Sequence, residues 1–184
     1  MNIIVKPHGS DLCYCRPDTT WERENRDFYS PDCVNEVLWT PIVFARVSKA
    51  GKCIGKKFAS RYYDAVGCGI LMYGNNDMAF GSCIDHTSIL PMPLHNPEVL
   101  EEEKAFKVFR NDEPFAVMST EQNQWRHLLE EALCNASRLT SVRIGDFIAV
   151  ELASPAGLAT REDKEVSVKG IFCDNEIFSF QIRF

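Results

Sequence analysis

The spacing of apolar and polar residues along the chain predicts a protein built mostly from β-strands. Residues 37–48 (VLWTPIVFARVS) and 66–73 (VGCGILMY) are rich in β-branched and aromatic side chains, which favour strands. Residues 12–16 (LCYCR) predict a shorter strand. Pro41, inside residues 37–48, indicates a sheet edge or a bulge, because proline has no main-chain N–H to donate to a neighbouring strand.

Two further segments have the pattern of β-hairpins. Residues 104–119 place apolar side chains on both sides of the polar stretch RNDEP. The end of the chain, with EVSVKGIF and EIFSFQIRF around CDN, predicts a second hairpin. Alternate residues of its last strand are apolar and share one face: Phe178, Phe180, Ile182 and Phe184. Residues 142–153 predict a turn that leads into another strand.

Two segments have helical periodicity. In residues 56–66 (KKFASRYYDAV), Phe58, Tyr62 and Val66 fall on one stripe. Residues 119–137 carry the clearer signal, and Ser119 and Gln122 have the spacing of a capping box at their start. The apolar stripe of this second helix consists of Trp125, Leu128, Leu129, Ala132 and Leu133.

The order of these elements predicts an α+β fold that is mostly β, with two principal helices. A doubly wound fold would need more helices between its strands. A chain of 184 residues has the size of one compact domain, so we expect a single domain over residues 1–184. Residues 79–98 hold three prolines and little periodicity, which predicts a long irregular connection of the kind that often lines a site.

The charge and the apolar pattern narrow the range of partners. The net charge is −6 at pH 7 and there is no basic stripe, so we expect no nucleic-acid partner. No apolar run approaches the ~18 residues of a membrane helix, so we expect no membrane partner. The N-terminal stretch MNIIVKPHGSD lacks the features of a signal peptide. We therefore expect a cytoplasmic protein.

The eight cysteines are scattered over positions 13, 15, 33, 53, 68, 83, 134 and 173. They form no C-x-x-C pair, and no histidine lies at zinc spacing from them. We expect reduced thiols that pack as small apolar side chains.

The order of several short segments carries a further signal. They are RPDTTW (16–21), DFYSPD (27–32), FARVSKAGK (44–52), KKFASRYYDAVGCGI (56–70), CIDHTS (83–88), RIGDFIAVELASPAGLA (143–159) and VSVKGIFCDNEIFSFQIR (166–183). From about residue 12 to residue 184, this ordered set resembles the fumarylacetoacetate hydrolase family, in particular its short single-domain bacterial members. RPDTTW resembles the family's Lys-Pro-Asp-Thr-Ala-Leu type of segment, for example, and CIDHTS resembles a Phe-Asp-Gly-Ser tract.

The resemblance implies a mixed β-roll or β-barrel curled around a central cleft, and a homodimer. Family members cleave, decarboxylate, hydrate or isomerise acylpyruvate-like and oxaloacetate-like acids. They hold Mg²⁺ or Mn²⁺ through a Glu-x-Glu pair on one strand and an Asp, with a Lys near the cleft. The cation acts as a Lewis acid, and as a hard ion it requires oxygen ligands.

The positions that match these metal ligands carry other residues in this chain. The two Glu positions fall on Thr40 and Ile42, and the Asp position falls on Leu71. The Lys position falls on Ser82. The segment before residue 12 is also shorter than in the family, and His8 is only a weak counterpart of a family histidine there. The resemblance therefore implies a metal site that is lost, with no catalytic residue intact and no cofactor.

A relocated Mg²⁺ or Mn²⁺ site is the alternative, and its weak candidate ligands are Glu36, Asp77 and Asp85. Each of His86, His95 and His127 is expected to be a surface or second-layer residue. The residues expected to line the cleft, with or without a metal, are Arg16, Asp18, Thr40, Ile42, Leu71, Ser82, Asp85, His86 and Ser154.

Three functions follow from these observations. The first is a non-catalytic member of the family, a pseudoenzyme that keeps the fold and a cleft for a small-molecule ligand. The second is an enzyme, either a metal-dependent hydrolase, decarboxylase or isomerase of 2-oxo acids with relocated ligands, or a metal-independent enzyme that uses Asp85, His86 or a cysteine. The third is a partner subunit of an active paralogue.

Overall fold

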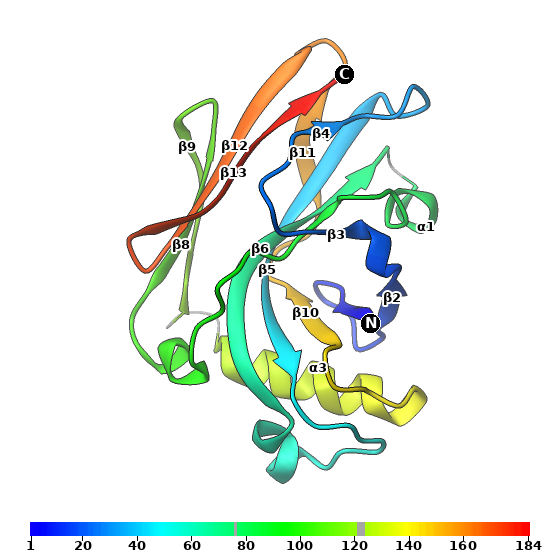
Figure 1. Ribbon diagram of the computed structural model, residues 1–184, viewed down its shortest axis with the longest axis vertical. Coiled ribbons are helices and arrows are strands. Elements are labelled where there is room, and N and C mark those ends of the chain that lie inside the picture. Colours follow the sequence, from blue (N-terminus) through cyan, green and yellow to red (C-terminus); the bar gives the residue numbers. More distant parts are fainter. Residues whose placement is uncertain (76, 121–123) are drawn as a thin grey trace.

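Two β-sheets make up most of the computed structural model, which describes residues 1–75, 77–120 and 124–184 (Figure 1). Sheet A consists of β1 (Ile3–Lys6), β2 (Tyr14–Arg16), β3 (Trp21–Glu22), β5 (Glu36–Val47), β6 (Tyr63–Gly74), β7 (Ser88–Ile89), β10 (Phe147–Glu151) and β11 (Ala156–Thr160). Sheet B consists of β4 (Phe28–Tyr29), β8 (Ala105–Arg110), β9 (Glu113–Ser119), β12 (Glu165–Phe172) and β13 (Asn175–Arg183). The described helices are α1 (Met78–Gly81), α3 (Trp125–Leu139) and three short 3₁₀ helices, η1 (Asp18–Thr20), η2 (Lys56–Arg61) and η3 (Pro97–Glu101).

The strands of sheet A follow the order β2-β1-β10-β5-β6-β7-β3, and β11 also pairs with β5. The order in sheet B is β4-β13-β12-β8-β9. The α+β fold class is confirmed, as are both hairpins, because β8 pairs with β9 and β12 pairs with β13 in antiparallel fashion. The sequence prediction missed β1, whose four residues pair in parallel with β10.

The long antiparallel pair β5 and β6 lies inside sheet A, and both strands bend strongly in Figure 1. Successive side chains of a strand point to opposite faces. Accordingly Leu38, Ile42 and Phe44 face one side of β5, whereas Trp39 and Val43 face the other. Both faces are buried, which explains why these strands are almost continuously apolar.

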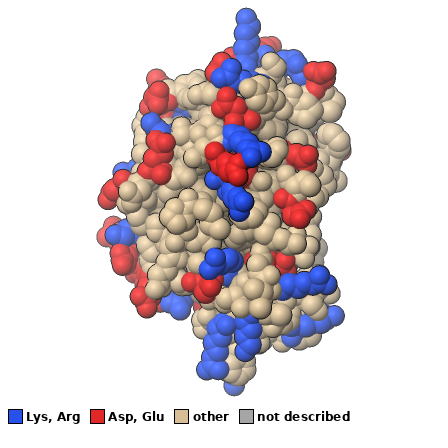
Figure 2. Space-filling view, in the orientation of Figure 1, with Lys and Arg blue, Asp and Glu red and all other residues tan. Residues whose placement is uncertain are grey.

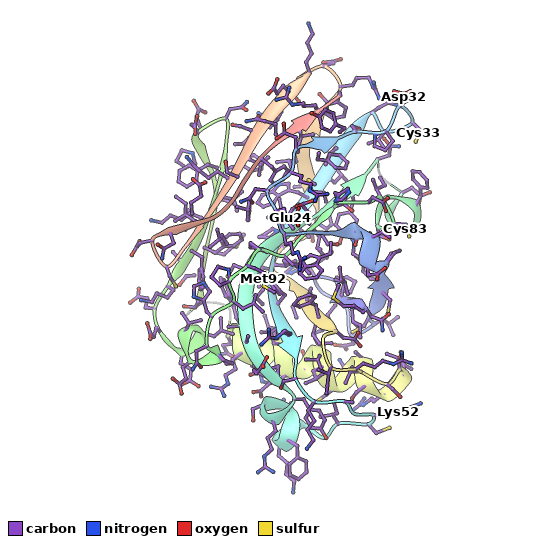
Figure 3. The ribbon with its side chains drawn as sticks, in the orientation of Figure 1. Glu24, Asp32, Cys33, Lys52, Cys83 and Met92 are labelled. Atoms are coloured by element: carbon purple, nitrogen blue, oxygen red, sulfur yellow. The ribbon has the colours of Figure 1, made fainter. Side chains whose placement is uncertain are left out.

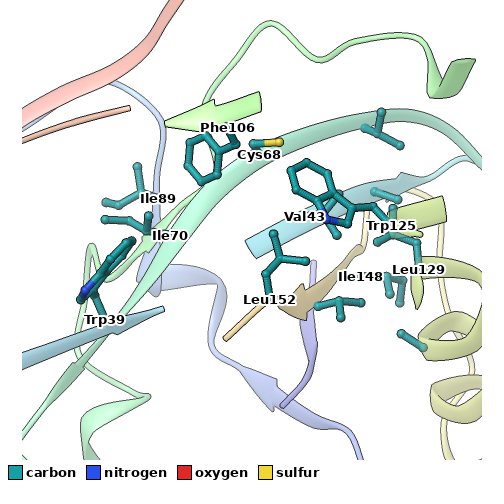
Figure 4. Close-up of a cluster of buried hydrophobic side chains, with 14 of the residues drawn as sticks. Trp39, Val43, Cys68, Ile70, Ile89, Phe106, Trp125, Leu129, Ile148 and Leu152 are labelled. Atoms are coloured by element: carbon teal, nitrogen blue, oxygen red, sulfur yellow. The ribbon is translucent and has the colours of Figure 1, made fainter. Parts of the chain in front are cut away.

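Each face of sheet A contributes to a separate apolar core. The larger core lies between sheet A, sheet B and α3, and Figure 4 shows part of it around Trp39, Phe106 and Trp125. The inner core lies on the opposite face, inside the curl of sheet A. It contains Ile3, Val5, Leu38, Ile42, Phe44, Leu71, Tyr73, Leu90, Phe147 and Ala149. The inner core occupies the face of β5 and β6 that carries Thr40, Ile42 and Leu71, the positions predicted from the resemblance to correspond to metal ligands.

The helix predicted over residues 56–66 is largely wrong. Residues 56–61 form the short helix η2, and β6 already begins at Tyr63. Residues 63–66 pair with the end of β5, with Val47 opposite Tyr63 and Ala45 opposite Val66. The hydrogen bonds and burial that β5 offers outweigh the helical spacing of the apolar residues.

Pro41 lies in the middle of β5, where the sequence predicted a sheet edge or a bulge. On one side of β5, β10 pairs with residues 42–46 and β11 pairs with residues 36–39, so Pro41 sits where one neighbour replaces the other. The Pro41 carbonyl oxygen accepts a hydrogen bond of 2.9 Å from Leu152 N on this side. The N–H and C=O of one residue in an antiparallel pair point to the same neighbour. The N–H that Pro41 lacks would point to the place where β11 gives way to β10, so its absence removes no hydrogen bond between β5 and β6.

The second predicted helix is confirmed as α3, although it begins at Trp125. Ser119 belongs to β9, and Gln122 lies outside the described residues, so the predicted capping box is not tested. None of the helices in the described part of the chain is long and apolar enough to cross a membrane.

All eight cysteines are free thiols. Cys68 and Cys134 are buried as predicted. The prediction of apolar packing is wrong for Cys15, Cys33, Cys53 and Cys83, which are exposed in loops and short elements where no apolar layer covers them.

Basic side chains gather at one end of the molecule, at the bottom of Figure 2. The connection between β5 and β6 carries them, and we call residues 49–61 the basic loop. It contains no acidic residue, and its basic residues are exposed: Lys49, Lys52, Lys56, Lys57 and Arg61. Lys52 is labelled in Figure 3. The chain therefore combines an acidic net charge with a local cluster of positive charge.

Candidate functional site

The three positions predicted to have lost metal ligands lie close together in the fold. Thr40 on β5 is directly opposite Leu71 on β6, and Ile42 lies two residues further along the same face of β5. All three side chains are 0% exposed. The Thr40 hydroxyl donates a hydrogen bond of 2.6 Å to the carbonyl oxygen of Ala153, while Ile42 and Leu71 pack in the inner core.

These side chains do not fit a divalent cation. Two of them are hydrocarbons, and the hydroxyl of the third is already engaged, whereas Mg²⁺ and Mn²⁺ require several converging oxygen ligands. Within residues 1–75, 77–120 and 124–184, no group of three or more His, Cys, Asp or Glu side chains is arranged to hold a metal ion.

The alternative ligands lie apart from these positions. Glu36 is half-buried at the start of β5. Asp77 is exposed, and its carboxylate accepts hydrogen bonds from the N–H groups of Ala79 and Phe80 at the start of α1. Asp85 is exposed on the wall of a surface groove. The structure therefore does not bring Glu36, Asp77 and Asp85 into one cation site.

A buried polar cluster adjoins the inner core. Tyr73 on β6 donates a hydrogen bond to the Glu151 carboxylate on β10, and its hydroxyl oxygen lies 2.7 Å from the hydroxyl of Tyr14 on β2. The second Glu151 oxygen accepts a hydrogen bond of 3.0 Å from the main-chain N–H of His8. Burial raises the pKa of the Tyr73 hydroxyl and that of the Glu151 carboxyl.

Arg16 completes this polar cluster. Its Nη2 donates hydrogen bonds to the carbonyl oxygen of Met72 (2.9 Å) and the hydroxyl of Thr87 (2.6 Å), and its guanidinium lies 4.9 Å from the centre of the Tyr73 ring. Its Nε and Nη1 have no hydrogen-bond partner within the described residues. Burial lowers the pKa of the guanidinium, and the nearby tyrosines and Glu151 oppose this effect. The cluster links β2, β6 and β10 of sheet A, and its Arg16, Tyr73 and Glu151 side chains are buried while Tyr14 is half-buried.

An open groove lies at the rim of sheet A, and we call it the rim groove. It consists of a cavity of about 790 Å³ and an adjoining cavity of about 220 Å³, which share Arg26 and His86. Glu24, on the smaller cavity, and Cys83, on the larger one, are labelled in Figure 3. The segment 79–98 was predicted to line a site, and its residues 80 and 83–86 do line the larger cavity.

His86 and Glu22 form a pair in the rim groove. His86 Nδ1 lies 2.9 Å from Glu22 Oε2, and the other carboxylate oxygen accepts a hydrogen bond of 2.6 Å from Glu24 N. Glu22 is only 4% exposed, whereas the His86 side chain is 47% exposed. The backbone of His86 is in the left-handed region, with φ at 60°, and its N–H donates to the carbonyl oxygen of Thr19.

The predicted cleft residues occupy two different environments. Arg16, Thr40, Ile42, Leu71 and Ser82 are buried. Asp18, Asp85, His86 and Ser154 are exposed. The Ser82 hydroxyl donates to the carbonyl oxygen of Ala79 and closes the turn after α1.

The sequence prediction missed Tyr73, Glu151 and Glu22. Alternation along β6 places Tyr73 on the same face as Leu71, and Glu151 is the one acidic residue of the apolar strand FIAVE, so both carried a signal. Glu22 carried none, because its partner His86 is 64 residues away. The short strands β3 and β7, which pair in parallel, bring the two segments together.

Comparison with known proteins gives matches in structure only. No family model matches the sequence, and no curated protein matches it. Solved structures match over almost the whole chain. A candidate fumarylacetoacetate hydrolase family protein from Yersinia pestis CO92 superposes with a TM-score of 0.79 and 10% identity, over 98% of this chain and 91% of that chain.

Two other similar structures have named activities. Fumarylpyruvate hydrolase from Pseudomonas aeruginosa, in complex with Mn²⁺ and pyruvate, has a TM-score of 0.74 and 13% identity, over 99% of this chain and 95% of that chain. The 5-carboxymethyl-2-hydroxymuconate delta-isomerase from Mycobacterium smegmatis has a TM-score of 0.78 and 10% identity, over 97% of this chain and 77% of that chain. This chain therefore has the fold of the fumarylacetoacetate hydrolase family.

Proposed function

We propose that this chain keeps the family's fold without its metal-dependent chemistry and acts as a non-catalytic member that needs no metal cofactor. One observation carries the proposal. Thr40, Ile42 and Leu71, which the sequence resemblance matches to the family's metal ligands, are buried, and the Thr40 hydroxyl is bonded to the main chain while Ile42 and Leu71 lie in the inner core.

The energetic cost of a cation at this place supports the proposal. A divalent ion that leaves water must be compensated by oxygen ligands, and a buried charge without partners is strongly unfavourable. The inner core offers a layer of hydrocarbon side chains there instead. A cation would have to displace packed side chains as well as lose its water.

Calorimetric titration of Mn²⁺ into the chelator-treated protein tests the proposal. We expect no saturable heat and no thermal shift at millimolar metal. We also expect no turnover of an acylpyruvate or of oxaloacetate with added Mg²⁺ or Mn²⁺. The fumarylpyruvate hydrolase of Pseudomonas aeruginosa, whose structure contains Mn²⁺, is the positive control.

Saturable binding at one site, or metal-dependent turnover, would overturn the proposal. Single variants Glu36→Gln, Asp77→Asn and Asp85→Asn would then show which carboxylate had become a ligand. Loss of binding in one of them would establish a relocated metal site.

A further inference from the structure

The rim groove contains a histidine, His86, that contacts a buried carboxylate through Nδ1 and whose Nε2 has no hydrogen-bond partner among the described residues. Because an ionised carboxylate can only accept hydrogen bonds, the Glu22 contact of 2.9 Å places the hydrogen of the neutral imidazole on Nδ1. Nε2 then has a free lone pair. The His86 side chain is 47% exposed and lines both cavities of the groove.

Main-chain hydrogen bonds hold Glu22, the partner of His86, in place. Glu22 is the last residue of β3, and its carbonyl oxygen accepts a hydrogen bond from Leu90 N. Its carboxylate also accepts a hydrogen bond from Glu24 N. A buried carboxylate needs such partners to remain charged. The backbone of His86 is in the left-handed region, where histidine is one of the non-glycine residues found more often than most, and its ring contacts Glu22.

The walls of the groove combine exposed aromatic rings with more acidic than basic side chains. Phe80 is 50% exposed and Tyr29 is 70% exposed, so both offer ring surface to a ligand. Two arginines face four carboxylates around the two cavities: Arg23, Arg26, Glu22, Glu24, Asp27 and Asp85. Arg26 is paired with Glu24, and Arg23 lies over the ring of Trp21. Arg183, from outside the two cavities, is paired with Asp27, so the carboxylates still outnumber the arginines around the groove. An anionic ligand would meet net repulsion here.

We propose that the rim groove binds a neutral aromatic molecule that carries a hydroxyl group. The ring lies between Phe80 and Tyr29, and the hydroxyl donates a hydrogen bond to His86 Nε2. Glu22 is a positioning residue, because it fixes the tautomer and the orientation of the imidazole. The inference goes beyond the proposed function, since the groove uses none of Thr40, Ile42 and Leu71, and it stands or falls independently of the metal titration.

Three probes of similar size test the ligand class: 2-naphthol, 2-methoxynaphthalene and 2-naphthoate. We expect saturable binding of 2-naphthol, monitored by calorimetry, about fivefold to tenfold tighter than that of 2-methoxynaphthalene, which has no hydrogen to donate. We expect 2-naphthoate to bind more weakly than 2-naphthol because of the surrounding carboxylates.

Two variants test the residues. His86→Asn tolerates the left-handed backbone and can still donate to Glu22, but it lacks Nε2, so its affinity for 2-naphthol should fall to that for 2-methoxynaphthalene. Glu22→Gln should change the ¹⁵N chemical shifts of the His86 ring toward a mixture of tautomers, which a purely structural role would not do. His127→Asn, on the exposed face of α3, is the matched control and should leave binding unchanged.

Other outcomes would overturn the proposal. Equal binding of 2-naphthol and 2-methoxynaphthalene would mean that only apolar contact acts in the groove. Tighter binding of 2-naphthoate would assign the groove to anions. An undiminished affinity of His86→Asn for 2-naphthol, or no binding of any probe to the natural protein, would exclude His86 as the recognition group.

Discussion

At the scale of single residues, Glu151 links the buried polar cluster to pH. Burial raises the pKa of its carboxyl in the folded state above the ordinary value of 4.5. The folded state therefore holds this proton more tightly than the unfolded state does. The corresponding contribution to the free energy of unfolding is fully present below about pH 4.5, and it is lost as the pH rises through the folded-state pKa.

Substitution of this residue should remove that dependence. We expect the stability of the natural protein relative to Glu151→Gln to decrease as the pH rises above about 4.5. Urea unfolding of both proteins at several pH values measures the difference. Glu103→Gln, at an exposed position, should show no such trend. A stability difference between the natural protein and Glu151→Gln that is the same at every pH would contradict the expectation.

The sequence predicted some site residues better than others. The period of two along a strand is enough to place Thr40 and Ile42 on one face, and the pairing of β5 with β6 adds Leu71. The pair of Glu22 and His86 could not be predicted, because it depends on two strands of two residues each. Strands this short leave no periodic signal.

At the scale of elements, α3 shows how a helix with a clear apolar stripe is fixed by the core. Leu133 is 1% exposed within the larger core, whereas Leu139, at the end of the same helix, is 72% exposed. We expect Leu133→Ala to lower the free energy of unfolding by about 2–5 kcal/mol through lost burial and an unfilled cavity. Leu139→Ala should change it by less than about 0.5 kcal/mol.

Chemical denaturation of the two variants decides this point. They remove the same atoms from one helix and differ mainly in burial. Similar losses in both would contradict the role of burial, because helix propensity alone favours alanine over leucine at either position.

The accuracy of the predicted elements depended on distant strand partners as well as on the local patterns. The strands around residues 37–48 and 66–73, both hairpins and α3 have patterns of eight residues or more and were found. The helix predicted over residues 56–66 failed because β5 continues to Val47 and captures the residues from Tyr63 onward. A local pattern contains no information about such a distant partner.

At the scale of the whole molecule, the basic loop separates positive charge from an acidic body. The net charge is −6 at pH 7, yet residues 49–61 carry five basic side chains and no acidic one. Charges gathered in one patch act together within about one Debye length, which is roughly 8 Å at physiological salt. The patch therefore has its own electrostatic behaviour.

We expect the protein to be retained on a cation-exchange resin at pH 7 and low salt despite its negative net charge. Lys52→Glu combined with Lys57→Glu should abolish retention. Lys107→Glu combined with Lys164→Glu changes the net charge equally at exposed positions outside the loop and should have a smaller effect. The salt concentration at elution is the measurement, and equal effects of the two pairs would contradict the role of the loop.

This uneven distribution of charge gives the molecule a preferred orientation near a charged surface. Near any negatively charged surface, the whole protein would rotate so that the basic loop faces that surface, and the loop would hold the protein there by one end. In Figure 1, η2 within this loop lies at the bottom, while β4 and α1, whose residues line the rim groove, lie in the upper half. A layer of protein adsorbed through the loop would present its grooves outward, so that immobilisation on an anionic support would leave them accessible to molecules in solution.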